Sequence, residues 1–177
     1  MLAPDAGPAA PWSTVAGWQV AVAAAFGIAA CAFGLTGEGW FPVLDSANLV
    51  FHEAGHPLLG ALSQRLAVYG GTLMQLAIPL AVAGSFFRRR EALGFALAGV
   101  WAFQNFFNIA RYVADARAQA LPLVGGGDHD WAEILSRWGA LHLDGTLARL
   151  LALAGVLGVA GCVAWLALCW RRQVAEG

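Results

Sequence analysis

Lysine is absent from this chain of 177 residues, all ten basic residues are arginine, and charged residues make up only 12% of the sequence. Ordinary soluble domains have about 25% charged and about 45–50% apolar residues, whereas 59% of this chain is hydrophobic. One water-soluble core of this size cannot bury so many apolar side chains. The formal net charge is −1, and no basic arm or stripe is present, so we expect no nucleic-acid partner. The composition predicts a membrane protein surrounded by lipid.

Cysteine is scarce as well. Cys31, Cys162 and Cys169 lie in apolar runs and form no CxxC pair, which excludes a disulfide framework and a thiolate metal site. The seven prolines and 22 glycines follow no period of three, which excludes a collagen-like chain. Neither a secreted disulfide scaffold nor a fibrous protein fits this sequence.

Five long apolar stretches predict an all-α membrane protein with about five hydrophobic helices plus one amphipathic interfacial helix. Four stretches carry no charge and are long enough to cross about 30 Å of hydrocarbon as helices. The remaining one, residues 44–62, is apolar except for Asp45, His52, Glu53 and His56. The stretches cover residues 15–35, 44–62, 66–87, 92–110 and 150–170.

We expect a single helical membrane domain over residues 15–172, with its functional core in residues 44–121. Residues 1–14 contain three prolines and no arginine, so they predict a disordered tail and not a signal peptide. Residues 173–177 predict a second short tail.

The amphipathic helix is expected after Gly125-Gly126-Gly127, which predicts a flexible joint. Asp130 and Glu133 resemble a capping box at its start, and Trp131 begins an apolar face that recurs at helical spacing. Such a helix is suited to the membrane interface. The alternative is that it packs on the bundle as a lid.

His52-Glu53-Ala54-Gly55-His56 is an HExxH motif. Positions i and i+4 share one face of a helix, so both imidazoles can reach one Zn²⁺ while the glutamate faces a zinc-bound water. The sequence therefore predicts His52 and His56 as zinc ligands and Glu53 as the general base. Buried polar residues that satisfy one another are the alternative, because ionisable groups inside an apolar segment need compensation.

Two neighbours of the motif shape the predicted site. Gly55 has no side chain, so another backbone or a substrate can approach the helix. Pro57 lacks the N–H that would bond the Glu53 carbonyl, which frees an acceptor beside the metal. Farther along, Gln75 is expected to hydrogen-bond either a substrate backbone or a neighbouring helix.

Zinc held by two histidines needs a third protein ligand and leaves one position for water. Asp115 is the first candidate. It shares one helix face with Gln104, Asn108 and Arg111, and a polar face on a membrane helix should face the interior of the bundle. Its alternative role is an ion pair with Arg111. The second candidate is His129, whose alternative place is a solvated interfacial loop. The third candidate is Asp144, whose alternative role is to cap the N-terminus of the last helix.

The motif and its neighbours resemble the core of the site-2 proteases, which are intramembrane zinc metalloproteases. The resemblance covers residues 44–121 and consists of a membrane-embedded HExxH, a hairpin helix, and a third helix that carries an asparagine and a later aspartate. It implies that His52, His56 and Asp115 bind zinc, that Glu53 is the base, and that Asn108 corresponds to the family's asparagine. Arg111 stands where that family has a proline.

Short stretches also resemble a group of small bacterial membrane proteins without an assigned activity. These are residues 70–76, 104–108 and 126–131. This second resemblance implies no reaction.

We therefore expect a zinc-dependent protease that cleaves membrane-associated proteins, with Gly55, Gln75 and Asn108 near the substrate. The alternatives are a non-catalytic zinc-binding membrane protein and a zinc hydrolase of a lipid or small amide. If all five helices span, Arg88–Arg90 and Arg171–Arg172 lie on one side, which the positive-inside rule places in the cytoplasm. The expected location is the inner (cytoplasmic) membrane, as a multi-pass protein.

Overall fold

The computed structural model describes residues 11–36, 40–124 and 128–176. These residues form helices and no strand, so the predicted all-α fold is confirmed. Four segments are long and apolar enough to cross a membrane. They are α1 (Gly17–Leu35), α3 (Gln64–Arg88), α4 (Ala92–Ala114) and the segment Leu141–Glu176, which contains the short 3₁₀ helix η1 (Leu141–Leu143) and α6 (Asp144–Glu176).

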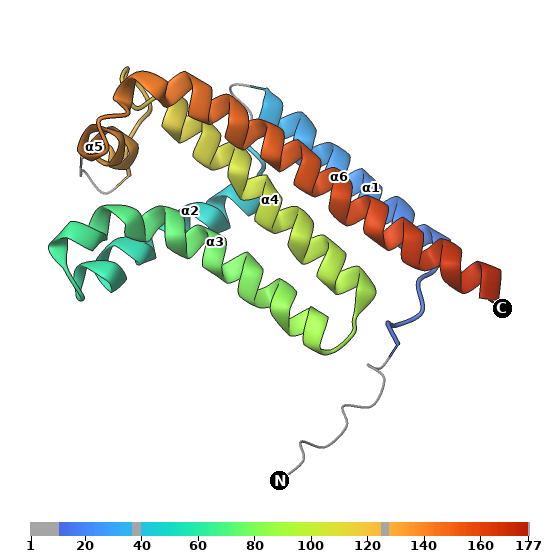
Figure 1. Ribbon diagram of the computed structural model, residues 1–177. Coiled ribbons are helices and arrows are strands. Elements are labelled where there is room, and N and C mark those ends of the chain that lie inside the picture. The colour runs from blue at the N-terminus through green and yellow to red at the C-terminus, as the bar shows by residue number, and fades with distance from the viewer. Residues whose placement is uncertain (1–10, 37–39, 125–127, 177) are drawn as a thin grey trace, which may run out of the picture.

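Helices α1, α4 and α6 lie side by side, and α3 packs against α4 on the other flank (Figure 1). Small residues of α6 allow the close approach to α4. A Cβ atom added at Gly158 would lie 2.0 Å from the ring of Phe103, and one at Gly155 would lie 2.9 Å from the ring of Phe107. The large rings of α4 therefore fill positions where α6 has no side chain, which fixes α4 as the central helix.

The helix that carries HExxH is α2 (Leu44–Gly60), and it is not among the four segments that can span. Its 17 residues cover only about 26 Å. It begins partway along α4, where Asp45 accepts hydrogen bonds from Gln104 and Asn108. The hydrophobic helix expected over residues 44–62 is therefore present, and buried polar contacts start it inside the bundle.

Both arginine clusters lie at one end of the bundle, which we call the arginine end (Arg88–Arg90 and Arg171–Arg172). Ser13 N–H donates to the Arg90 carbonyl at 2.8 Å, and Val15 N–H donates to Gln173 Oε1 at 2.8 Å. The two predicted tails therefore need correction. Residues 1–10 lie outside the described part of the chain, but residues 11–14 contact the bundle, and residues 173–176 continue α6.

The opposite end, which we call the site end, contains the α2–α3 turn, the end of α4 and the start of α6 (Figure 1). Helix α5 (Asp130–Arg137) lies across it. Ile134 and Leu135 of α5 are buried, and Arg137 donates to the Arg65 carbonyl at 2.8 Å. Of the two arrangements expected for this amphipathic segment, packing on the bundle is the one observed. The predicted joint at 125–127 lies outside the described residues.

Candidate metal centre

Helices α2 and α3 touch backbone to backbone beside the HExxH motif. A Cβ atom at Gly55 would lie 2.0 Å from the Gly70 carbonyl oxygen, and one at Gly70 would lie 2.2 Å from the Gly55 oxygen. The next residue, Gly71, leaves room for the imidazole of His52, which lies 2.5 Å from where its Cβ would be. Gly55 therefore admits another backbone, as expected, and that backbone belongs to α3 and not to a substrate.

Each histidine of the motif is oriented by a hydrogen bond from Nδ1. His56 Nδ1 lies 2.9 Å from the carbonyl oxygen of Ala67, which can only accept, so this nitrogen carries the proton. His52 Nδ1 lies 3.0 Å from Oε1 of Gln75, which accepts in the same way. Both Nε2 atoms are thereby left with a lone pair, which is the form that binds metal.

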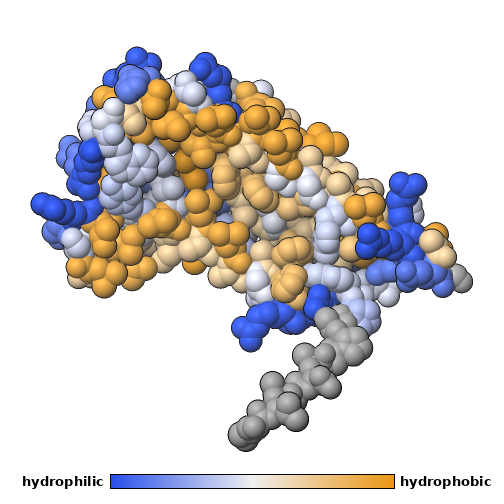
Figure 2. Space-filling view, viewed as in Figure 1, coloured by the Kyte–Doolittle hydropathy of each residue, from blue (hydrophilic) through white to orange (hydrophobic). Residues whose placement is uncertain are grey.

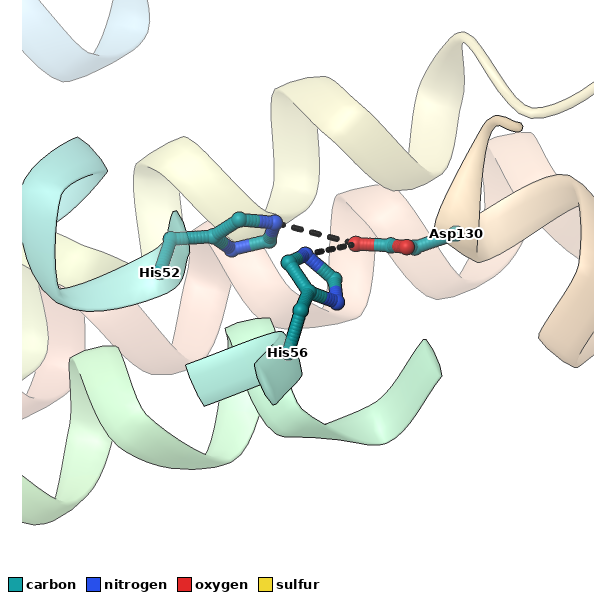
Figure 3. A group of neighbouring side chains, drawn as sticks. All are labelled: His52, His56 and Asp130. Carbon is teal, nitrogen blue, oxygen red and sulfur yellow. Dashed lines mark hydrogen bonds and ion pairs between the residues drawn. The ribbon is translucent and has the colours of Figure 1, made fainter. Parts of the chain in front are cut away.

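A carboxylate oxygen meets these two lone pairs (Figure 3). Oδ2 of Asp130 lies 2.9 Å from His52 Nε2 and 3.3 Å from His56 Nε2. Among the described residues, His52, His56 and Asp130 are the group whose ligand atoms all lie within 4.8 Å of one another. Two tetrahedral ligands at about 2.0–2.1 Å from zinc are separated by roughly 3.3 Å. The three side chains therefore suit one tetrahedral metal ion after shifts of a few tenths of an ångström.

Electrostatics favours a cation at this point. Three acceptor atoms converge in a group whose side chains are largely buried, and lone pairs at such distances repel one another unless positive charge lies between them. One divalent ion compensates the carboxylate and contacts both imidazoles at once. The donor set, two imidazole nitrogens and one carboxylate oxygen, is one that zinc accepts.

Asp130 is held in place by residues of α4 and by its own helix. The backbone N–H of Asp130 donates to the Tyr112 hydroxyl at 3.1 Å. His129 is the N-cap of α5, and its Nδ1 accepts from the Ala132 N–H at 3.2 Å. The ring of His129 also packs 4.1 Å from that of Tyr112. The start of α5 is therefore fixed at the level of the two histidines.

None of the three residues predicted as the third ligand belongs to the group formed by His52, His56 and Asp130. These residues are Asp115, His129 and Asp144. Asp115 accepts hydrogen bonds from the N–H groups of Ala120 and Leu121 and lies 3.3 Å from His129 Nε2. Asp144 pairs with Arg117 at 2.6 Å. The structure thus places Asp130 where we expected Asp115, because Asp115 lies beyond the last turn of α4 and its carboxylate closes the following loop.

Asp130 escaped the sequence analysis because we assigned it to a capping box with Glu133. In the structure His129 caps the helix, and Glu133 pairs with Arg137 instead. The signal was present: two aspartates flank a histidine immediately before a helix with an apolar face. Such a helix lies in the membrane interface or packs on the bundle, and the packing observed here carries its first residue to the polar part of α2.

The other predicted site residues line or flank the centre. Gln75 contacts His52, so it bonds a neighbouring helix, which was one of its two expected roles. Asn108 donates to Asp45 at 2.9 Å. Asp45, in the first turn of α2, is buried and also accepts from the Phe41 N–H at 2.6 Å. Glu53 is half-buried on α2 beside His52.

A cavity of about 530 Å³ adjoins the centre. Its inner end is formed by buried residues, among them His52 and Gln75, and its outer end by exposed residues, among them Trp40 and Val124. Most of the wall is apolar, with Leu49, Ile109, Leu121, Pro122, Leu123 and Trp131 from four segments of the chain. The cavity therefore connects the metal-binding group with the surface.

Comparison with known proteins finds no family model, no curated protein and no solved structure that matches this chain. The assignment of the centre consequently depends on the geometry of the chain's own residues.

Proposed function

We propose that this chain is a zinc-dependent, membrane-embedded protease that hydrolyses peptide bonds of membrane-associated proteins. The observation that carries the proposal is that Asp130 of α5 meets the two histidines of the HExxH motif of α2. Three protein ligands leave the fourth position of a zinc tetrahedron open, as in catalytic sites, whereas structural sites are closed by four.

The chemistry follows from the roles of the chain's residues. His52, His56 and Asp130 would hold the zinc, which would polarise the substrate carbonyl and lower the pKa of a water molecule toward neutral pH. Glu53 takes that proton as the water oxygen adds to the carbonyl carbon. The same carboxyl then gives a proton to the amide nitrogen as the carbon–nitrogen bond breaks, which yields a carboxylate and an amine.

Pro57 favours an amide substrate over an ester. It lies inside α2 and has no N–H to donate to the carbonyl of Glu53, so that carbonyl lacks its helical partner. A peptide substrate has backbone N–H groups that can donate to this oxygen, and a lipid ester has none. The second candidate, a zinc hydrolase of a lipid or small amide, is favoured by one observation, the apolar cavity beside His52.

The proposal is tested with purified protein loaded with zinc and a set of quenched fluorogenic peptides rich in large apolar residues. Glu53→Gln is expected to retain zinc and lose at least about 100-fold in cleavage rate, because the general base is removed. Glu91→Gln, at the arginine end, is the matched control and is expected to cleave like the original chain. A Glu53→Gln protein with full activity contradicts the mechanism, and a zinc-loaded protein that cleaves none of the peptides favours the non-catalytic alternative.

For the location we propose the inner membrane, with the arginine end in the cytoplasm. Hydrophilic residues gather at both ends and apolar residues between them (Figure 2). At the site end, Arg117 and Arg137 are paired with Asp144 and Glu133. Arg88–Arg90 and Arg171–Arg172 have no ion pair with the described residues, and neither do Arg65, Arg111 and Arg149 at the site end. Five unpaired arginines against three favour the arginine end as the cytoplasmic one.

This orientation places the metal centre toward the external face. In a variant without native cysteines, a membrane-impermeant maleimide added to intact cells is expected to label Asp128→Cys and not Ala175→Cys. The reverse pattern contradicts the proposed orientation.

A further inference from the structure

We infer that the cavity beside His52 binds large apolar side chains of the substrate next to the bond that is cut, so that the substrates are peptide segments with consecutive large apolar residues. This inference rests on the proposed function and adds the substrate class to it. The volume of about 530 Å³ lies within the range of small-molecule sites. It exceeds the space that one side chain needs, so a segment of two or three residues fits.

The position of the cavity relative to the metal ligands gives the first reason. His52 belongs both to the metal-binding group and to the wall of the cavity. Leu49, three residues earlier on α2, lines the same cavity and shares a helix face with His52. A group that fills the cavity is therefore adjacent to a carbonyl held at the metal.

The second reason is that Asn48 and Asp45, two buried polar residues of the lining, already have partners. Asn48 donates to Gln104 at 2.8 Å and accepts from Trp101 at 2.7 Å. Asp45 accepts from Gln104 at 2.6 Å and from Asn108 at 2.9 Å. Among the buried polar atoms of the lining, Thr72 Oγ1 and Trp131 Nε1 have no partner among the described residues. A charged side chain that enters the cavity would lose its water and find only these two free buried atoms, which costs free energy. An apolar side chain has no polar group that would need a partner there.

The third reason is the surrounding wall. Leu49 comes from α2, Ile109 from α4, Trp131 from α5, and residues 121–124 from the segment after α4. Four separate parts of the chain thus present apolar atoms to one space. Burial of a leucine-sized side chain against such a wall contributes about 10- to 100-fold in affinity.

Hydroxamates test this inference because they bind the metal directly and can carry any side chain. The probes are acetohydroxamate, the hydroxamate of N-acetyl-leucyl-leucine, and a dodecanoyl hydroxamate. Each is titrated into detergent-solubilised, full-length protein loaded with Co²⁺, and binding is followed by the visible absorption of the metal. We expect the leucyl-leucine probe to bind at least about tenfold more tightly than acetohydroxamate, and more tightly than the dodecanoyl probe.

Variants that fill the cavity separate this preference from detergent effects. Leu49→Trp, or Ile109→Trp should the first not fold, is expected to remove the preference for the leucyl-leucine probe over acetohydroxamate. Leu58→Trp is the matched control, because Leu58 is an exposed residue of the same helix that does not line the cavity.

Each result has a distinct meaning. If acetohydroxamate binds but neither larger probe binds better, or if Leu49→Trp and Ile109→Trp both keep the preference, the substrate inference is overturned and the metal centre stands. If the dodecanoyl probe binds best, the cavity accepts an acyl chain and the peptide class is overturned. If no hydroxamate changes the absorption of Co²⁺ held by the protein, the open coordination position fails, and the proposed function fails with it.

Discussion

Oδ2 of Asp130 lies 2.9 Å from Nε2 of His52, although 78 positions separate the two residues in the chain. The contact joins the first residue of α5 to the middle of α2, and it makes the lid helix part of the metal-binding group. A metal ion held by this group would therefore tie α5 to α2.

Replacing Asp130 should weaken zinc binding strongly. Asp130→Asn removes the negative charge between the two histidines, and we expect the zinc affinity to fall by more than the 10- to 100-fold typical for loss of an outer-shell partner. Competition with a zinc chelator measures the effect. Asp128→Asn is the matched control, since Asp128 is exposed and two positions away; equal losses in both variants would exclude Asp130 as a ligand.

Gln75 should affect zinc binding through His52. Gln75→Leu removes the acceptor for Nδ1–H, so the imidazole loses its orientation, and we expect zinc affinity to fall by about 10- to 100-fold. Gln75→Glu keeps an acceptor and is expected to bind zinc at least as tightly as the original chain. The two affinities, measured by the same competition, should differ in this order; equal effects of both variants would contradict the role of the Nδ1 bond.

Asp115 should contribute to stability in a pH-dependent way. Burial alone raises its pKa, but the N–H groups of Leu121 and Ala120 and the imidazole of His129 lower the pKa of Asp115 below its ordinary value overall. A lowered pKa in the folded state means that the contribution is present above the ordinary value of about 3.9 and is lost as the pH falls through the folded-state pKa.

The measurement is thermal unfolding of Asp115→Asn and the original chain at several pH values. We expect the variant to be less stable at pH 7 and the difference to shrink as the pH falls below about 4. The variant should still retain zinc. Loss of zinc in Asp115→Asn with retention in Asp130→Asn would restore Asp115 as the third ligand.

The contact between α2 and α3 should tolerate no side chain. Gly55→Ala places a methyl group against the Gly70 carbonyl, and we expect a loss of about 1–3 kcal/mol in unfolding free energy. Gly84→Ala, in the same hairpin, meets no atom within 4 Å and is expected to gain up to about 1 kcal/mol from helix propensity. Unfolding in detergent compares the two variants. If both glycines respond alike, close packing does not position the motif.

The sequence predicted what depends on local spacing. The uncharged runs marked the four helices that are long and apolar enough to cross a membrane, and the i, i+4 spacing of His52 and His56 placed both in one group. It did not predict contacts that depend on tertiary packing. Asp45 starts α2 inside the bundle, and Asp130 arrives from a docked helix 78 residues away from His52.

Zinc content, measured by mass spectrometry on purified full-length protein, tests the central claim most directly. The account predicts one zinc per chain in the original protein and in Glu53→Gln, and none in His52→Ala. A His52→Ala protein that retains a full equivalent of zinc, or an original chain that binds none after purification with zinc present, would contradict it.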